Sequence, residues 1–138
     1  MSLSQTLLTQ PTQPPLRLLD LMERLSAAIG HAGAGELAEL FIADGRQALA
    51  GIDRAQKELD LAALRSLLAD LRGISAMISA HRLARACGEP LAHDATVVAA
   101  QVAGVQEEWN RTEWLLSTWM RVHDLRPTWL PGQRLARA

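Results

Sequence analysis

The chain has 138 residues, about the length of one domain, and its formal net charge of −1 offers no basic surplus that would attract nucleic acid. Nearly half of it is apolar (49%) but only 4% is aromatic, a mixture that favours an all-α domain over a β-rich one. The single cysteine excludes an internal disulfide, no apolar run reaches the roughly 18 to 20 residues that span a bilayer, and the first residues do not resemble a signal peptide. We therefore expect a soluble cytoplasmic domain without a membrane or nucleic-acid partner.

The beginning of the chain divides into a leader and a first helix. Residues 1–14 end in the Pro- and Gln-rich QPTQPP and are expected to form a flexible leader, ahead of a helical region over 15–123. From Pro15 an apolar residue recurs every three or four positions, which predicts a short amphipathic helix that stops in the glycines of GHAGAG (30–35). Its apolar residues are Leu16, Leu19, Met22, Leu25 and Ile29.

Two longer helices are predicted next. The first runs from about Glu36 to Glu58, and Gly45 and Gly51 weaken it without ending it. Its apolar residues are Leu37, Leu40, Phe41, Ala48, Leu49 and Ile52. The second covers about 61–78 and has a plausible N-cap in Asp60. Its apolar stripe consists of Leu61, Leu64, Leu68, Leu71 and Ile78, widened by Leu67 and Ile74.

Two further helices complete the pattern. A short one covers about 80–88, and a long one starts at Asp94 or Thr96 and ends at about His123. The inward-facing residues of the short helix are Leu83 and Cys87. Spacings of four and three alternate along the long helix, which indicates a packing seam of a helical bundle. The seam consists of Val98, Val102, Val105, Trp109, Thr112, Leu116 and Trp119.

The last segment, 124–138, contains two prolines and is net basic, so we expect a loosely ordered tail. Nothing in the pattern requires a strand. The sequence therefore predicts an all-α fold: an antiparallel four-helix bundle with an additional short N-terminal helix.

No catalytic or metal motif stands out. The four histidines are far apart in the sequence, and none has a second cysteine or a Glu-x-x-His partner with ligand spacing. They are His31, His81, His93 and His123. The glycines do not form a phosphate-binding loop after a strand. We therefore expect neither a metal nor a cofactor.

The helix over 61–78 carries an unusual strip opposite its leucine stripe. Its members lie three or four residues apart and are mostly small: Arg65, Ala69, Arg72, Gly73 and Ala76. A glycine in mid-helix costs about 1 kcal/mol relative to alanine, which is tolerated where another backbone or molecule approaches closely. Gly73 either packs against another helix of the bundle or leaves room for a partner protein.

The same region resembles a known family. Residues 36–88, and more loosely 16–120, are similar to histidine-containing phosphotransfer (HPt) domains of bacterial phosphorelays. ELAELFIADGRQALAGIDRA resembles the family's second helix, and ELDLAALRSLLADLRG resembles the approach to its active helix. Two motifs match in one register: Leu71, Arg72 and Gly73 for Leu-Lys-Gly, and Arg82, Leu83, Ala84 and Cys87 for Arg-Leu-Ala-x-x-Cys. The resemblance implies a bundle of HPt type.

The chain departs from the family at the position that matters most for activity. Ala69 stands where the resemblance places the phosphoacceptor histidine, four residues before Gly73. A methyl group has no lone pair with which to accept a phosphoryl group, and Asp70 points about 100° further around the helix. Either the natural gene encodes this alanine or a histidine has been replaced.

The resemblance thus implies a signalling adaptor that is not an enzyme. Its expected partner is a response-regulator receiver domain or a histidine kinase, bound through the strip of Arg65, Ala69, Arg72, Gly73 and Ala76. Arg72 replaces the family's lysine, and a cation there still suits an acidic receiver pocket. We expect the chain to act as a monomer.

Two alternatives stay open. In the first, the chain is an active phosphotransfer protein that uses a displaced acceptor, His81, near the start of the fourth bundle helix. In the second, it is a scaffold whose binding region runs from Trp114 to Trp129, because Trp114 falls off the packing seam and tryptophan is common at interface hot spots.

Overall fold

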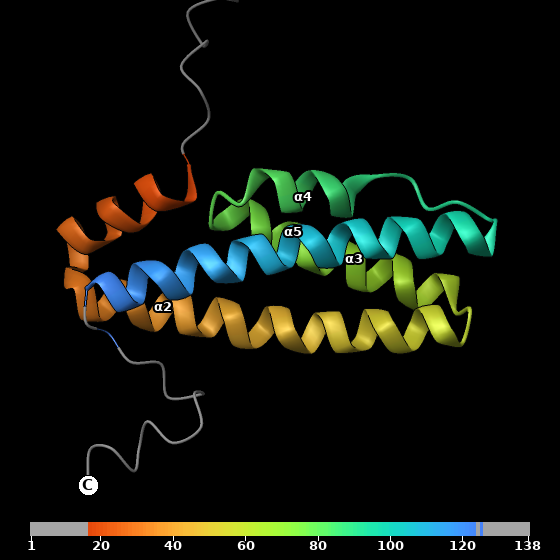
Figure 1. Cartoon of the computed structure of the whole chain (residues 1–138), viewed down its shortest axis with the longest axis horizontal. Helices are drawn as coiled ribbons and strands as arrows, with labels where there is room; N and C mark the ends of the chain where they lie inside the picture. Colours follow the sequence, from red (N-terminus) through yellow and green to blue (C-terminus); the bar gives the residue numbers. More distant parts are fainter. Residues whose placement is uncertain (1–16, 124, 126–138) are drawn as a thin grey trace, which may run out of the picture.

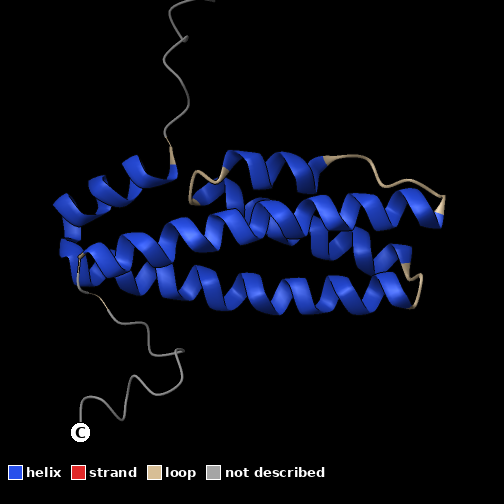
Figure 2. Ribbon diagram, in the orientation of Figure 1, coloured by secondary structure: helices blue, strands red, loops and turns tan. Residues whose placement is uncertain are grey.

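A computed structural model of the chain describes residues 17–123 and 125, and this part is all-α (Figure 1). The helices are α2 (Leu18–Lys57), α3 (Leu61–Met77), α4 (His81–Gly88) and α5 (Ala95–Val122). Figure 2 shows no strand among the described residues. The expected leader, 1–14, lies outside the described residues, as does the expected tail, 124–138, apart from Leu125.

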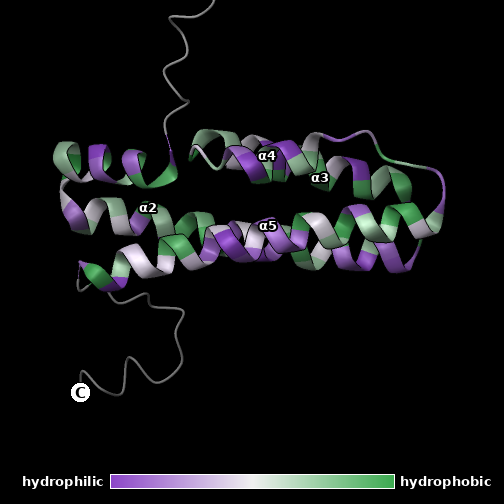
Figure 3. Cartoon of the chain, turned by 45° about the horizontal axis from the view of Figure 1, so that its top comes forward, coloured by the Kyte–Doolittle hydropathy of each residue, from purple (hydrophilic) through white to green (hydrophobic). Residues whose placement is uncertain are grey.

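The four helices form an antiparallel bundle, as predicted. α2 packs against α3 and α5, and α4 packs against the same two helices from the other side. The chain runs back and forth along the long axis in Figure 1, so each helix is antiparallel to the next one in sequence. Figure 3 shows hydrophobic and hydrophilic residues interleaved along every helix, because each has one buried side.

The expected break after the first helix is a kink and not a loop. Gly30 has φ 85° and ψ 161°, a backbone conformation that glycine adopts without steric strain. The first helix therefore ends at Gly30, within the predicted 30–35, but the second begins directly after it and not at about Glu36. Ala34 and Gly35 are buried, and this packing offsets the low helix propensity of the glycine-rich stretch. Residues 18–29, which we call the N-terminal arm, fold back along the bundle (Figure 1).

The predicted boundaries and caps of the other helices are confirmed to within about two residues. Asp60 accepts a hydrogen bond from the backbone N–H of Ala63 at 3.0 Å, which caps α3. Asp94 is the N-cap of α5 and accepts from the N–H groups of Thr96 (2.8 Å) and Val97 (3.2 Å). Both helices therefore begin where a side chain satisfies their first free donors.

The core confirms the predicted stripes of α3, α4 and α5. The buried members are Leu64, Leu68, Leu71, Ile78, Leu83, Cys87, Val98, Val105, Trp109, Thr112, Leu116 and Trp119. The remaining members are partly buried: Leu61, Leu67, Ile74 and Val102. Long, regular periodicity in these helices was therefore a sound guide to burial.

The predicted apolar face of α2 is wrong over its first half. Four expected core residues are exposed: Leu19, Ile29, Leu37 and Leu40. The expected Met22 and Phe41 are buried, and the other buried positions are Leu18, Ser26, Ala34, Gly35, Ala38, Ile42 and Gly45. The reason is the size of the neighbouring side chains. A Cβ atom at Gly45 would overlap the indole ring of Trp109, so small α2 residues face the large rings of α5.

Candidate functional site

The outward face of α3 carries all five residues predicted to bind a partner. The leucine stripe of α3 faces the core, so the opposite side of the helix is turned to solvent. The five exposed residues are Arg65, Ala69, Arg72, Gly73 and Ala76, and we call them the α3 face. Met77 extends this surface and is 84% exposed.

Gly73 is not explained by packing inside the bundle. Apart from the backbone of its own helix and its chain neighbours, no described atom lies within 4 Å of the position that a Cβ would occupy. The hypothesis that Gly73 packs against another helix of the bundle is therefore wrong for the described residues. The glycine lowers the stability of α3 without admitting a neighbour from the part of the chain that the structure describes.

A hollow of about 430 Å³ lies beside Ala69, between α3 and the end of α4. α3 contributes Arg65, Leu68, Ala69 and Arg72, and the following segment contributes Cys87, Gly88, Glu89, Pro90 and Leu91. We call it the Ala69 hollow. The structure thus brings three of the five predicted residues to one depression. Gly73 and Ala76 lie outside its lining, further along the same face of α3.

Gly88 positions Arg72 over this hollow. A Cβ at Gly88 would lie 3.2 Å from Nε of Arg72 and 3.3 Å from its Cζ, so the glycine allows the arginine side chain to lie across the end of α4. Arg65 and Arg72 form no hydrogen bond or ion pair with any residue in the described ranges. Sequence reasoning did not single out Gly88, although a glycine closing a helix before a proline was a usable signal.

The cysteine in the wall of the hollow stays neutral. Burial raises the pKa of Cys87 to about 12, and the positive charge of Arg72 only partly opposes this effect. A thiol with so high a pKa is a poor nucleophile at neutral pH. The hollow therefore offers two cations, one carboxylate (Glu89) and apolar surface, and no activated nucleophile among its lining residues.

His81 lies apart from this hollow. It is the exposed first residue of α4, whereas the Ala69 hollow borders the last residues of that helix. Seven residues of helical rise separate the two ends, or roughly 10 Å. His81 lines a different depression, of about 320 Å³, together with Leu18 of the N-terminal arm and Arg111 of α5.

Trp114 projects from the outer side of α5 and is 61% exposed. It lies off the buried seam, as predicted, and does not cover an edge of the bundle. Trp129, the other end of the alternative binding region, lies outside the described residues.

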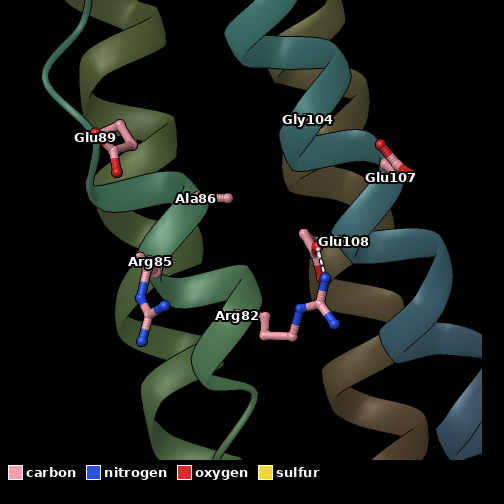
Figure 4. Close-up of a pocket in the computed structure, with 7 residues that line it drawn as sticks. All are labelled: Arg82, Arg85, Ala86, Glu89, Gly104, Glu107 and Glu108. Atoms are coloured by element: carbon pink, nitrogen blue, oxygen red, sulfur yellow. Dashed lines mark hydrogen bonds and ion pairs between the residues drawn. The ribbon is translucent and has the colours of Figure 1, made fainter.

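A second hollow, of about 350 Å³, lies between α4 and α5 and was not predicted from the sequence (Figure 4). Arg82 and Glu108 point toward one another across the gap and form an ion pair at 3.0 Å. Arg85, Glu89 and Glu107 complete its charged lining. The lining contains both arginines and glutamates, and Arg82 and Glu108 already neutralise one another. This hollow therefore favours neither an anionic nor a cationic ligand.

Sequence reasoning also missed a cluster at the end of α5. The rings of His31 and His123 stack with centroids 4.2 Å apart, and Trp119 lies 4.5 Å from His123. Glu23 of the N-terminal arm accepts a hydrogen bond from Nε1 of Trp119 at 3.0 Å and lies 3.4 Å from Nε2 of His123. The Trp119 bond holds the pKa of Glu23 below its usual 4.5; desolvation opposes this effect, and His123 and His31 add smaller contributions that lower the pKa. This Trp119 cluster fastens the arm to α5.

Within residues 17–123 and 125, no group of three or more His, Cys, Asp or Glu side chains could hold a metal ion. No described helix is long and apolar enough to cross a membrane. Comparison of the chain with protein-family models, with curated proteins and with solved structures finds no match.

Proposed function

We propose that the chain is an HPt-like signalling adaptor that binds a response-regulator receiver domain or a histidine kinase through the α3 face and carries no phosphate. This proposal rests on the family resemblance of residues 36–88 and on the exposed surface that the corresponding helix presents. Such a role belongs in the cytoplasm, where receivers and kinase domains operate.

The observation that carries the proposal is the empty space around Gly73. A mid-helix glycine lowers helix stability by about 1 kcal/mol, and here no side chain of the described bundle occupies the room it provides. A partner that approaches the α3 backbone closely gives the glycine a function. The exposed methyl groups of Ala69 and Ala76 keep the same surface flat.

The charge of the α3 face suits an acidic partner. Arg65 and Arg72 are exposed and are not neutralised by a described carboxylate, so both remain available for charge-assisted hydrogen bonds. At Ala69 the methyl group has no lone pair and accepts no phosphoryl group. Binding without transfer would let the adaptor occupy a receiver or kinase and block its usual partner.

Calorimetric titration of the chain with each purified receiver domain and kinase of its source organism tests the proposal. We expect at least one to bind, and Gly73→Gln to weaken that complex about tenfold or more, because the new side chain blocks close approach. Gly104→Gln is the matched control. Gly104 is also a helical glycine with open space around it, but it lies on α5. Failure of every receiver and kinase to bind, or equal effects of both substitutions, would contradict the proposal.

The first alternative is phosphotransfer through His81. An acid-labile phosphohistidine that forms on incubation with a phosphorylated receiver or kinase, and that is lost in His81→Ala, would favour it. The position of His81 argues against this alternative. A partner docked beside Ala69 would meet the last residues of α4, whereas His81 is the first residue of that helix.

The second alternative is a scaffold that binds through α5. The exposure of Trp114 favours it, since tryptophan is enriched at the hot spots of protein interfaces. If Trp114→Ala or deletion of 126–138 abolishes binding while Gly73→Gln does not, the α3 face is not the site.

A further inference from the structure

The Ala69 hollow holds two arginines that the described bundle leaves unpaired. Arg65 lies four residues before Ala69 and Arg72 three residues after it, so both are neighbours of its methyl group on the helix surface. Two other exposed arginines differ in this respect, because Arg82 pairs with Glu108 and Arg46 pairs with Glu113. The unpaired guanidinium groups therefore concentrate positive potential at one depression.

The lining of the hollow favours an anion over a cation. Two guanidinium groups face one carboxylate, that of Glu89, and the thiol of Cys87 adds no negative charge because burial keeps it protonated. Gly88 leaves room for the side chain of Arg72 to lie beside the hollow. Planar guanidinium groups match the oxygens of a phosphoryl group in paired hydrogen bonds.

The hollow also has room for such a group. At about 430 Å³ it is open beside a methyl side chain, where a longer side chain would occupy part of the space. A phosphoryl group carried by a partner could therefore enter without displacing a side chain of α3.

Given the proposed docking of a receiver, we infer that the Ala69 hollow accepts the phosphoryl group of a phosphorylated receiver aspartate, and that the chain binds phosphorylated receivers in preference to unmodified ones. Arg65 and Arg72 donate hydrogen bonds to the phosphoryl oxygens. No bond is made or broken, since Ala69 offers no nucleophile. The chain would then respond to the phosphorylation state of its partner while leaving the phosphate in place.

The test compares each receiver domain with and without beryllofluoride, which occupies the phosphorylated aspartate as a phosphoryl mimic, by calorimetric titration against the full chain. We expect the beryllofluoride form to bind about tenfold more tightly, as charge-assisted hydrogen bonds imply. The ratio of the two affinities should fall to about one in the double variant Arg65→Gln with Arg72→Gln. It should rise in Glu89→Gln, which removes the opposing carboxylate.

A control variant, Arg54→Gln with Arg111→Gln, removes the same charge from exposed positions outside the hollow and should keep the ratio. Equal affinity for both receiver forms overturns this inference and leaves the proposed adaptor role standing. A preference that survives in the Arg65 and Arg72 double variant also overturns it. Absence of binding to every receiver in both forms overturns the inference, and if no kinase binds either, the proposed function fails with it.

Discussion

One substitution, glycine to alanine, should have opposite effects at two positions of this bundle. At Gly73 the added methyl group enters open space on an exposed helix face. Alanine favours a helix over glycine by about 1 kcal/mol, so Gly73→Ala should stabilise the fold by about 0.5–1 kcal/mol. For a domain of this size that corresponds to a rise of about 2–4 °C in the midpoint of thermal unfolding.

At Gly45 the same methyl group would overlap the indole of Trp109, which is 3% exposed and packs against Phe41 with ring centroids 5.4 Å apart. The ring has little room to retreat. Overpacking of this kind costs about 1–3 kcal/mol, and the gain in helix propensity offsets only about 1 kcal/mol of it. Gly45→Ala should therefore lower the free energy of unfolding by up to about 2 kcal/mol.

Urea unfolding, followed by circular dichroism, gives the change in the free energy of unfolding for each variant, provided that the dependence of this free energy on urea concentration is the same as in the wild type. The free energies of unfolding of the two variants should differ by about 0.5–3 kcal/mol, with the wild-type chain between them. A Gly73→Ala protein less stable than wild type would refute the argument, because it would mean that the α3 face is occupied within the bundle. A Gly45→Ala protein as stable as Gly73→Ala would show that Trp109 does not fill the space beside α2.

Three further predictions concern the caps, the Trp119 cluster and the thiol. Asp60→Ala should cost about 1 kcal/mol in urea unfolding, because it leaves the N–H of Ala63 without its partner; an unchanged midpoint would show that the cap contributes nothing. The pKa of Glu23 is lower in the folded chain, so its contribution to stability is complete above pH 4.5 and is lost as pH falls through the folded-state value. Glu23→Gln should therefore flatten the fall in melting temperature between about pH 5 and pH 3, and an unaltered pH profile would count against the Trp119 bond. Cys87 should react with a thiol reagent far more slowly in the folded chain than in urea, and equal rates would contradict its burial and raised pKa.

Local signals in the sequence were sufficient for most of the fold. Asp60 and the alternating seam of α5 depend on spacing within one helix, and the structure places them as expected. The first half of α2 could not be predicted in this way. Its buried face includes several small residues, and the burial of one of them, Gly45, depends on Trp109, which lies more than sixty residues further along the chain.

The candidate site, like the fold, could be predicted from the sequence only in part. Periodicity on α3 was enough to place Arg65, Ala69 and Gly73 on one exposed face. The hollow beside Ala69 could not be foreseen, since it depends on how the end of α4 lies against α3. The stacking of His31 on His123 likewise depends on how α2 packs against α5, and nothing in the spacing of the two histidines suggests it.

The kink at Gly30 has a consequence for the cooperativity of the fold. The left-handed backbone there interrupts the ladder of helical hydrogen bonds, so the N-terminal arm is not continuous with the rest of α2. Its attachment depends on the burial of Leu18 and Met22 and on the bond from Trp119 to Glu23, which joins residues 96 positions apart. The arm can therefore open as a separate unit while the four main helices stay folded, and its amide hydrogens should exchange with solvent before those of α3 and α5.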